Sequence, residues 1–169
     1  MYDEFYHEIK TNFVCFMDPD RYGRSIWENS SFIAPTNNPN RSLWGSGFVA
    51  RLSGSTAEML SMWHLMFFGP ALFRMESGKL VFKAQPLLDG NFFPEDGMVR
   101  VRLFGKTEIE YHNPERINTY QAHVVKYEMY SSGHIQTVPA DCVVSPLAES
   151  IRKGLFDKIK IYMEKKEEA

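Results

Sequence analysis

The stretch that decides the fold is "SGSTAEMLSMWHLMFF", residues 53–68, the clearest helix signal in the sequence. Ser55 and Glu58 have the spacing of a capping box, in which the serine side chain accepts a backbone N–H and the glutamate reaches back. The residues that follow are apolar around most of the circumference, so we expect a helix that is buried on nearly all sides. Gly69 and Pro70 end it.

The entrance to this helix has the residues of an anion site. A helix N-terminus leaves backbone N–H groups unpaired and carries a partial positive charge. Hydroxyls of Ser53, Ser55 and Thr56 can donate to phosphate oxygens, Gly54 permits close approach to the backbone, and Arg51 can add a bidentate grip. The alternative, and the commoner use of such residues, is a helix capped by Ser55 with Arg51 on the surface. The residues alone leave both interpretations open.

Composition describes a packed globular protein and excludes several classes of function. The chain has 169 residues, enough for one ordinary domain, and 44% of them are hydrophobic. A formal net charge of -2 gives no basic stripe, which argues against a nucleic-acid partner. No apolar run is long enough to cross a membrane, and the N-terminus lacks the pattern of a secretion signal. Cys15 and Cys142 match no metal-ligand spacing, so we expect free thiols in the interior of a soluble, cytoplasmic protein.

The rest of the chain predicts an α+β fold. Residues 5–17 suggest a short strand or a buried segment, and residues 24–47 are rich in Asn, Ser, Pro and Gly, as in a long loop. From residue 72 the pattern turns to strands, with hairpins expected at Ser77–Gly78 and Ser132–Gly133. These strands fit an antiparallel sheet with one solvated face.

Two further stretches complete this expectation. Between the hairpins, Val99, Val101 and Leu103 alternate with Arg100 and Arg102, which we assign to the solvated face. The C-terminal stretch is expected to be a helix that starts at Ser145 and Pro146, because apolar residues recur every four positions. These residues are Leu147, Ile151, Leu155, Ile159 and Met163.

The loop from 18 to 31 combines carboxylates, amides and a tryptophan, the groups that bind sugar hydroxyls beside an aromatic platform. The alternative is a loop held by its own Asn and Asp side chains, with Trp27 buried. His64, among apolar neighbours, is expected to be a hydrogen-bonded core histidine, and no metal site is expected. The candidate sugar-binding residues are Tyr22, Arg24, Trp27, Glu28, Asn29 and Trp44.

Three stretches carry a family resemblance: "YGRSIWENSSFI", "GSGFVARLSGSTAEMLSMW" and "GKLVFKAQPLLDGNFF". They resemble the C-terminal part of cellobiose phosphorylase-like proteins, the inverting β-glycoside phosphorylases that include β-glucan and chitobiose enzymes. In that family a late helix begins with a hydroxyl residue, glycine and threonine. Here "SGSTA" has one additional serine between Gly54 and Thr56. The resemblance runs from about residue 13 to 115.

The resemblance implies a fold in which the terminal helices of an (α/α)6 barrel, residues 1–70, precede a small antiparallel β-domain with a C-terminal helix, residues 71–169. It implies that Ser53 and Gly54 help to hold attacking phosphate, the co-substrate, with no other cofactor. The reaction would be phosphorolysis of a β-linked oligosaccharide to an α-sugar 1-phosphate. The family's general acid, an aspartate in an upstream helix, has no match in this chain, so we expect the chain to be inactive alone.

Two other classes remain open. A carbohydrate-binding module would use Tyr22, Trp27 and Trp44 as platforms and would be indifferent to phosphate. A structural subunit would complete a barrel supplied by an upstream catalytic polypeptide, or would form a homodimer, through the apolar surface of helix 53–68. No nucleic-acid or membrane partner is expected.

Overall fold

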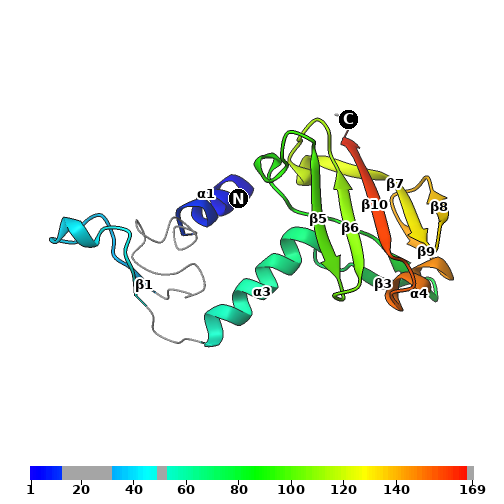
Figure 1. The fold of residues 1–169 in the computed structure, drawn as a ribbon, viewed down its shortest axis with the longest axis horizontal. Coiled ribbons are helices and arrows are strands. Elements are labelled where there is room, and N and C mark those ends of the chain that lie inside the picture. The colour runs from blue at the N-terminus through cyan, green and yellow to red at the C-terminus, as the bar shows by residue number, and fades with distance from the viewer. Residues whose placement is uncertain (13–31, 49–52, 167–169) are drawn as a thin grey trace. The chain divides into compact units, whose positions relative to one another are not determined.

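The computed structural model describes residues 1–12, 32–48 and 53–166 and divides into two compact units, Met1–Leu60 and Ser61–Ala169 (Figure 1). The division falls inside the helix α3 (Ser53–Phe68), whose bounds agree with the helix predicted from the sequence. For residues 53–57 the structure describes the backbone.

The first unit begins with a helix, α1 (Tyr2–Asn12). Asp3 and Glu4 lie in its first turn and Lys10 in its last, so the charges complement the helix dipole. Tyr6 and Ile9, three residues apart, are its buried side chains. Of the two alternatives expected for residues 5–17, the strand is wrong for residues 5–12, which are helical, and residues 13–17 lie outside the described residues.

The described part of the predicted loop contains a short two-stranded ribbon. Strand β1 (Phe32–Ile33) pairs antiparallel with β2 (Gly47–Phe48), with Phe32 opposite Phe48. Between them lies a single 3₁₀ turn, η2 (Arg41–Leu43), capped by the Asn40 side chain, which accepts from Ser42 N. Polar side chains thus organise a stretch that composition assigns to a loop.

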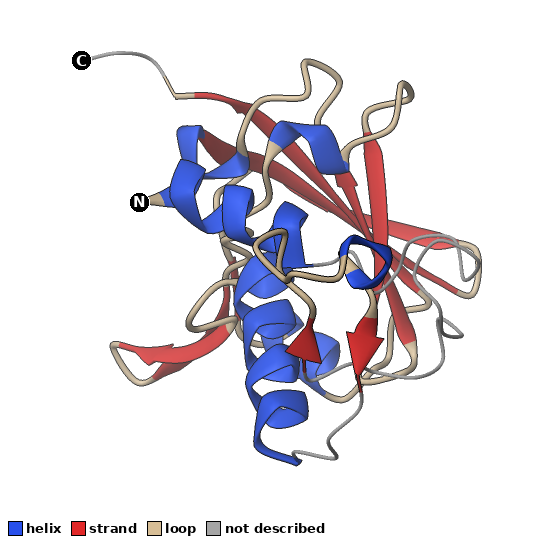
Figure 2. Ribbon diagram, turned by 90° about the vertical axis from the view of Figure 1, so that its left-hand side faces the viewer, coloured by secondary structure: helices blue, strands red, loops and turns tan. Residues whose placement is uncertain are grey.

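The second unit is built from two β-sheets (Figures 1 and 2). The larger sheet has the order β5-β6-β10-β7-β8 and the smaller sheet the order β3-β4-β9. Strand β10 pairs parallel with β6 and antiparallel with β7, so the larger sheet is mixed. The elements are β3 (Phe73–Glu76), β4 (Lys79–Phe82), η3 (Gly90–Phe92), β5 (Met98–Leu103), β6 (Thr107–His112), η4 (Thr119–Gln121), β7 (Ala122–Ser131), β8 (His134–Val138), β9 (Val143–Val144), α4 (Leu147–Arg152) and β10 (Lys158–Lys165).

The two hairpins predicted from the sequence are confirmed. Ser77 and Gly78 join β3 to β4, and Ser132 and Gly133 join β7 to β8. All four residues have positive φ, between 46° and 83°, as a type I′ turn requires at both central positions. The sequence reasoning missed a third tight turn between β5 and β6, where Phe104 (φ 53°) takes a conformation that a bulky side chain rarely adopts.

The core of the second unit follows the alternation of its central strands. Along β6 and β10, every second residue points inward and is buried. The side chains that are almost completely buried include Phe82, Leu88, Phe93, Ile109, Tyr111, Tyr127, Met129, Ile159 and Ile161.

The C-terminal turn of α3 is fixed to the β-rich unit by hydrogen bonds. Leu87 N donates to Met66 O at 2.8 Å, Gln85 N donates to Phe68 O at 3.2 Å, and the Tyr111 hydroxyl donates to Phe67 O. Carbonyls that every helix leaves unpaired at its C-terminus are satisfied in this way. Gly69, with φ 80°, ends the helix, and its N–H donates to Leu65 O.

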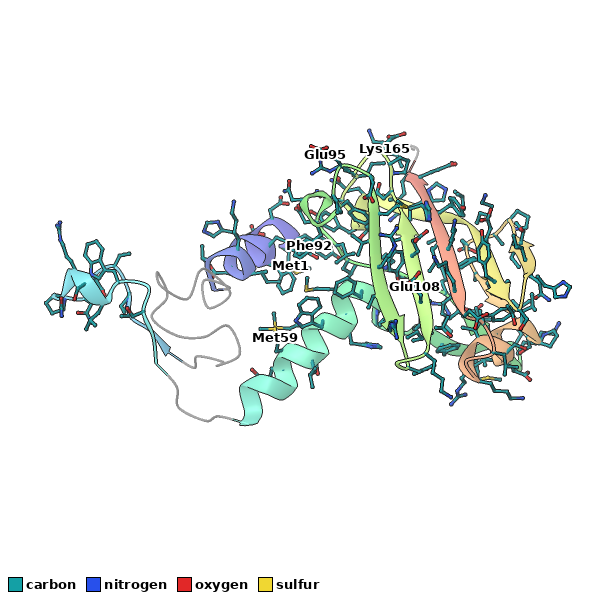
Figure 3. The ribbon with its side chains drawn as sticks, in the orientation of Figure 1. Met1, Met59, Phe92, Glu95, Glu108 and Lys165 are labelled. Atoms are coloured by element: carbon teal, nitrogen blue, oxygen red, sulfur yellow. The ribbon has the colours of Figure 1, made fainter. Side chains whose placement is uncertain are left out.

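The expectation that this helix is buried on nearly all sides is wrong. Of the side chains described on α3, Met66 and Phe67 are buried, whereas Leu60 is 66% exposed, Trp63 41% and Leu65 43%. Met59, labelled in Figure 3, lies on the half of α3 that precedes this buried turn. Hydrophobic composition predicted a buried helix, but among the side chains described on α3 the two that are buried lie near its C-terminal end.

The expected fold class is also wrong. The described residues form mainly β-structure, with α1, α3 and α4 as their α-helices, and are not part of an (α/α)6 barrel. The predicted C-terminal helix is replaced by the short α4 and by β10. A spacing of four residues fits a strand as well as a helix because four is a multiple of two. Gly154, with φ 67°, follows α4, and the alternation of Ile159, Ile161 and Met163 then continues as a strand.

Candidate functional site

The first turn of α3 contains four of the five predicted phosphate-binding residues. Ser53, Gly54, Ser55 and Thr56 open the helix, and Arg51 lies outside the described residues. Because the helix begins at Ser53, Ser55 is its third residue and not the N-cap that the capping-box interpretation requires. As at every helix N-terminus, the first backbone N–H groups of α3 have no partner within the helix, which is the feature that an anion site uses.

Of the predicted sugar-binding residues, Trp44 is the one that the structure describes; Tyr22, Arg24, Trp27, Glu28 and Asn29 lie outside the described residues. Trp44 follows η2 and is 38% exposed. Its indole N–H donates to Asn38 O at 2.8 Å, and the Arg41 guanidinium lies over the ring at 5.2 Å. The ring is thus held in place while part of it stays open to solvent.

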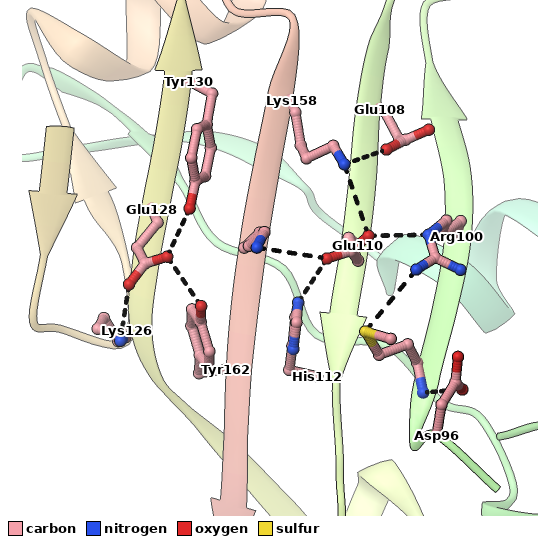
Figure 4. Close-up of polar contacts among 12 residues, drawn as sticks. Asp96, Arg100, Glu108, Glu110, His112, Lys126, Glu128, Tyr130, Lys158 and Tyr162 are labelled. Atoms are coloured by element: carbon pink, nitrogen blue, oxygen red, sulfur yellow. Dashed lines mark hydrogen bonds and ion pairs between the residues drawn. The ribbon is translucent and has the colours of Figure 1, made fainter. Parts of the chain in front are cut away.

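A second candidate site is the solvated side of the larger sheet, which we call the polar face (Figure 4). It arises because the residues that alternate with the buried ones on the central strands are charged or aromatic. Figure 3 places Glu108, one of its members, on the sheet. The polar face consists of Arg100, Glu108, Glu110, His112, Lys126, Glu128, Tyr130, Lys158, Lys160 and Tyr162.

Glu110 is the buried centre of one half of this face, with its side chain 4% exposed. Its carboxylate accepts from Arg100 Nε at 2.8 Å and contacts His112 Nε2 at 2.6 Å. Lys158 Nζ lies 3.7 Å away. Burial alone would raise the pKa of Glu110, but the hydrogen bonds from His112 and Arg100 and the charge of Lys158 outweigh it and lower the pKa. Glu110 therefore stays ionised.

Glu128 is the centre of the other half. Lys126 Nζ donates to one carboxylate oxygen at 2.8 Å, and the hydroxyls of Tyr130 and Tyr162 donate to the other at 2.9 and 2.8 Å. The bond from Lys126, helped by the two phenols and opposed by burial, lowers the pKa of Glu128 to about 2. Burial and the bond to Glu128 raise the pKa of Tyr162. One carboxylate thus collects three donors from two neighbouring strands.

The aromatic ring of Tyr162, on the polar face, is covered by its neighbours. His112, on β6, stacks on Tyr162 with ring centroids 4.7 Å apart, and Lys126, on β7, lies 3.8 Å from the centroid of the same ring. Because β6 and β7 flank β10, these contacts occupy both faces of Tyr162. Lys160 lies over Tyr130 at 5.4 Å. The Tyr162 ring therefore offers no open platform of the kind that stacks on a sugar.

The two central carboxylates of the polar face act through their charge and not as proton donors. A general acid needs a raised pKa to carry a proton near neutral pH, whereas Glu110 and Glu128 have lowered pKa values. Their contacts link β5, β6, β10 and β7 across the sheet. The polar face therefore joins strands and presents fixed charges, and its two central carboxylates are not proton donors.

Sequence reasoning found part of this face. It correctly placed Arg100 on the solvated side, where the side chain is 48% exposed. It missed Glu110, Glu128 and Tyr162. The alternation in "KIKIYM", residues 158–163, was a signal that could have placed Tyr162 on the polar side of a strand. The prediction of a core histidine at position 64 is wrong, because His64 is exposed and contacts the Phe68 ring.

The described residues contain no group of three His, Cys, Asp or Glu side chains placed to hold a metal ion. Cys142 is a half-buried free thiol beside Asp141, and burial raises its pKa. Cys15 lies outside the described residues. Within the described part of the chain, none of the helices combines the length and the apolar character that a membrane crossing requires.

Comparison with known proteins adds no relative: no family model and no curated protein matches the chain.

Proposed function

We propose that the chain is the non-catalytic C-terminal part of an inverting carbohydrate phosphorylase and contributes to its phosphate site. The whole protein would cleave a β-glucosidic bond with inorganic phosphate and release an α-sugar 1-phosphate. The observation that carries the proposal is the start of α3 at Ser53. This start puts the "SGST" of the family resemblance on the first helical turn, where backbone N–H groups can bind an oxyanion.

The chemistry requires a second component. Phosphate is already anionic, so phosphorolysis needs one protonated carboxylic acid at the leaving oxygen and no second carboxylate base. The lowered pKa values of Glu110 and Glu128 make both unsuitable as that acid. We propose that another polypeptide segment supplies it and that the isolated chain is inactive. A cytoplasmic location, with Cys142 as a free thiol, belongs to the same proposal.

Thermal unfolding in phosphate and in chloride at matched ionic strength tests the phosphate site. Phosphate at a hundred times its dissociation constant stabilises the native state by about 2.7 kcal/mol. The wild-type chain should melt at a higher temperature in phosphate, and Arg51→Ala should lose this increase. Arg152→Ala, at an exposed position of α4, is the matched control and should behave as the wild type. Equal responses of all three proteins would contradict the site.

An activity assay tests the second half of the proposal. The purified chain, incubated with β-linked glucan oligomers and phosphate, should form no sugar 1-phosphate. Formation of sugar 1-phosphate above the level of a heat-denatured sample would show that the chain carries its own general acid.

A carbohydrate-binding module is the second candidate, because Trp44 is held rigidly and partly exposed. Binding of an oligosaccharide that is lost in Trp44→Ala and unchanged by phosphate would favour this function over a phosphorylase part. The third candidate, a structural subunit, rests on the exposed Leu60, Trp63 and Leu65 of α3. If the chain is stably folded only in complex with a partner polypeptide, that result would favour the structural subunit.

A further inference from the structure

The edge strand β8 differs from the other edges of the described sheets. Edge strands expose unpaired backbone groups, and proteins usually protect them with charged side chains or keep them very short. Strand β5 carries Arg100 and Arg102, β3 carries Arg74 and Glu76, and β1, β2 and β9 have two residues each. Strand β8, "HIQTV", contains no Asp, Glu, Lys or Arg, and Ile135 on it is 58% exposed.

The register of the β7–β8 hairpin shows which backbone groups of β8 face outward. Ser131 and His134 flank a two-residue turn, so they form a hydrogen-bonded pair. Because hydrogen-bonded and non-hydrogen-bonded pairs alternate, Gln136 also bonds to β7, whereas Ile135 and Thr137 direct their N–H and C=O groups away from it. The free edge therefore offers two donors and two acceptors in a row.

We propose that β8 pairs with β8 of a second copy of this chain, antiparallel about a two-fold axis at Gln136. In this register Ile135 lies opposite Thr137 of the second copy, and both such pairs exchange two backbone hydrogen bonds. The two Gln136 side chains meet at the axis as a close, non-hydrogen-bonded pair.

Charge supports a second copy as the occupant. Pairing of β8 with itself brings no formal charges together, since the strand has none. Self-pairing of β5 would instead bring its arginines, Arg100 and Arg102, near those of the other copy, which is unfavourable. A strand pair this short buries less surface than a standard interface, so the dimer is weak and reversible.

Sedimentation velocity of the full chain, over roughly 10 to 300 μM, measures the association. Wild type should form a reversible dimer. Gln136→Lys and Gln136→Glu should each dimerise about five-fold more weakly, because like charges then meet at the axis. An equimolar mixture of the two variants should regain association as a heterodimer. Gln121→Lys, which adds the same charge at an exposed position off β8, is the matched control and should dimerise as the wild type.

Thr137→Pro provides a second test, because proline removes the outward-facing N–H and leaves the β7–β8 ladder intact. Because both copies carry the substitution, two of the four intersubunit hydrogen bonds are lost, and association should weaken at least roughly ten-fold. Circular dichroism and the melting temperature confirm that each variant is folded. A wild-type chain that stays monomeric throughout, or variants that associate as the wild type does, would overturn the proposal. The second result would place the contact elsewhere, for example on the apolar side of α3.

Discussion

Replacing Glu128 with glutamine should destabilise the protein at neutral pH, because Glu128 is the acceptor for three donors. Lys126, Tyr130 and Tyr162 all donate to its carboxylate at 2.8 to 2.9 Å. An amide has a single acceptor oxygen, and its NH₂ group would face donors. At least one donor on a half-buried face would therefore lose its partner.

The size of the effect follows from the pKa of Glu128. A fall of the pKa from 4.5 in the unfolded chain to about 2 in the folded protein means that the ionised carboxylate adds at most about 3.4 kcal/mol to the free energy of unfolding, at roughly 1.36 kcal/mol per pKa unit. The side chain is 18% exposed and its partner Lys126 is 35% exposed, so solvent screens part of this interaction. We expect Glu128→Gln to reduce the free energy of unfolding by about 1–2 kcal/mol at pH 7.

The pH dependence identifies the carboxylate charge as the source. Because the pKa is lower in the folded state, the stabilisation is complete above about pH 4.5 and is lost as the pH falls towards 2. At pH 3 less than about half of it should remain, so wild type and Glu128→Gln should differ less in stability.

Urea unfolding of wild type and Glu128→Gln at pH 7 and at pH 3 measures the difference in stability at each pH. If the dependence of the unfolding free energy on urea concentration is the same for both proteins, a shift of the unfolding midpoint gives this difference. Glu108→Gln is the matched control: Glu108 lies on the same face, is 33% exposed, and has Lys158 as its ion-pair partner at 2.8 Å. It should cost about 0.5 kcal/mol or less. The reasoning fails if Glu128→Gln unfolds with the wild-type midpoint at pH 7, or if its destabilisation is the same at pH 3.

Two further predictions concern the attachment of α3. Gly69→Ala should destabilise by about 2–4 kcal/mol in urea unfolding, since φ is 80° and a Cβ atom would clash with the Gln85 carbonyl; Gly133→Ala, with φ 83° and open space, should cost only about 1 kcal/mol. Equal costs would show that the close approach to Gln85 does not matter. Tyr111→Phe should lower stability by about 1–3 kcal/mol, because it leaves the Phe67 carbonyl without its buried donor. A melting temperature equal to that of the wild type would exclude this bond as an anchor.

Local signals in the sequence predicted the elements that local physics determines. The helix over 53–68 and the turns at Ser77–Gly78 and Ser132–Gly133 depend on neighbouring residues, and the structure has all three. A Ser-Gly pair marks a turn because glycine adopts a positive φ without steric cost. Phe104, at the missed turn, has no such preference, and its ring stacks on Phe73 with centroids 6.0 Å apart. At Phe104 a backbone conformation that the residue does not favour locally therefore occurs together with a contact to a residue distant in the sequence.

Sequence reasoning failed where distant segments meet. Strand β10 lies between β6 and β7, and its parallel pairing with β6 joins residues about fifty positions apart in the chain. Apolar residues that recur every four positions predicted a helix there, although the alternation of Ile159, Ile161 and Met163 favours a strand. The polar face was missed for the same reason, because Glu128 and Tyr162 become partners only when β10 is in place. Of the predicted phosphate and sugar residues, the described part of the chain gives a side-chain environment for Trp44 alone.

The two candidate sites differ in how far their polar groups are already satisfied. On the polar face each central carboxylate has several donors, and both faces of the Tyr162 ring are covered, so a ligand would have to displace contacts that hold the sheet together. At the first turn of α3, the backbone N–H groups have no partner within the helix. An anion bound there would therefore add hydrogen bonds without breaking any backbone hydrogen bond of the helix. Binding energy is most readily gained where internal contacts need not be lost. This difference is why we propose phosphate binding at Ser53–Thr56 and a structural role for the polar face.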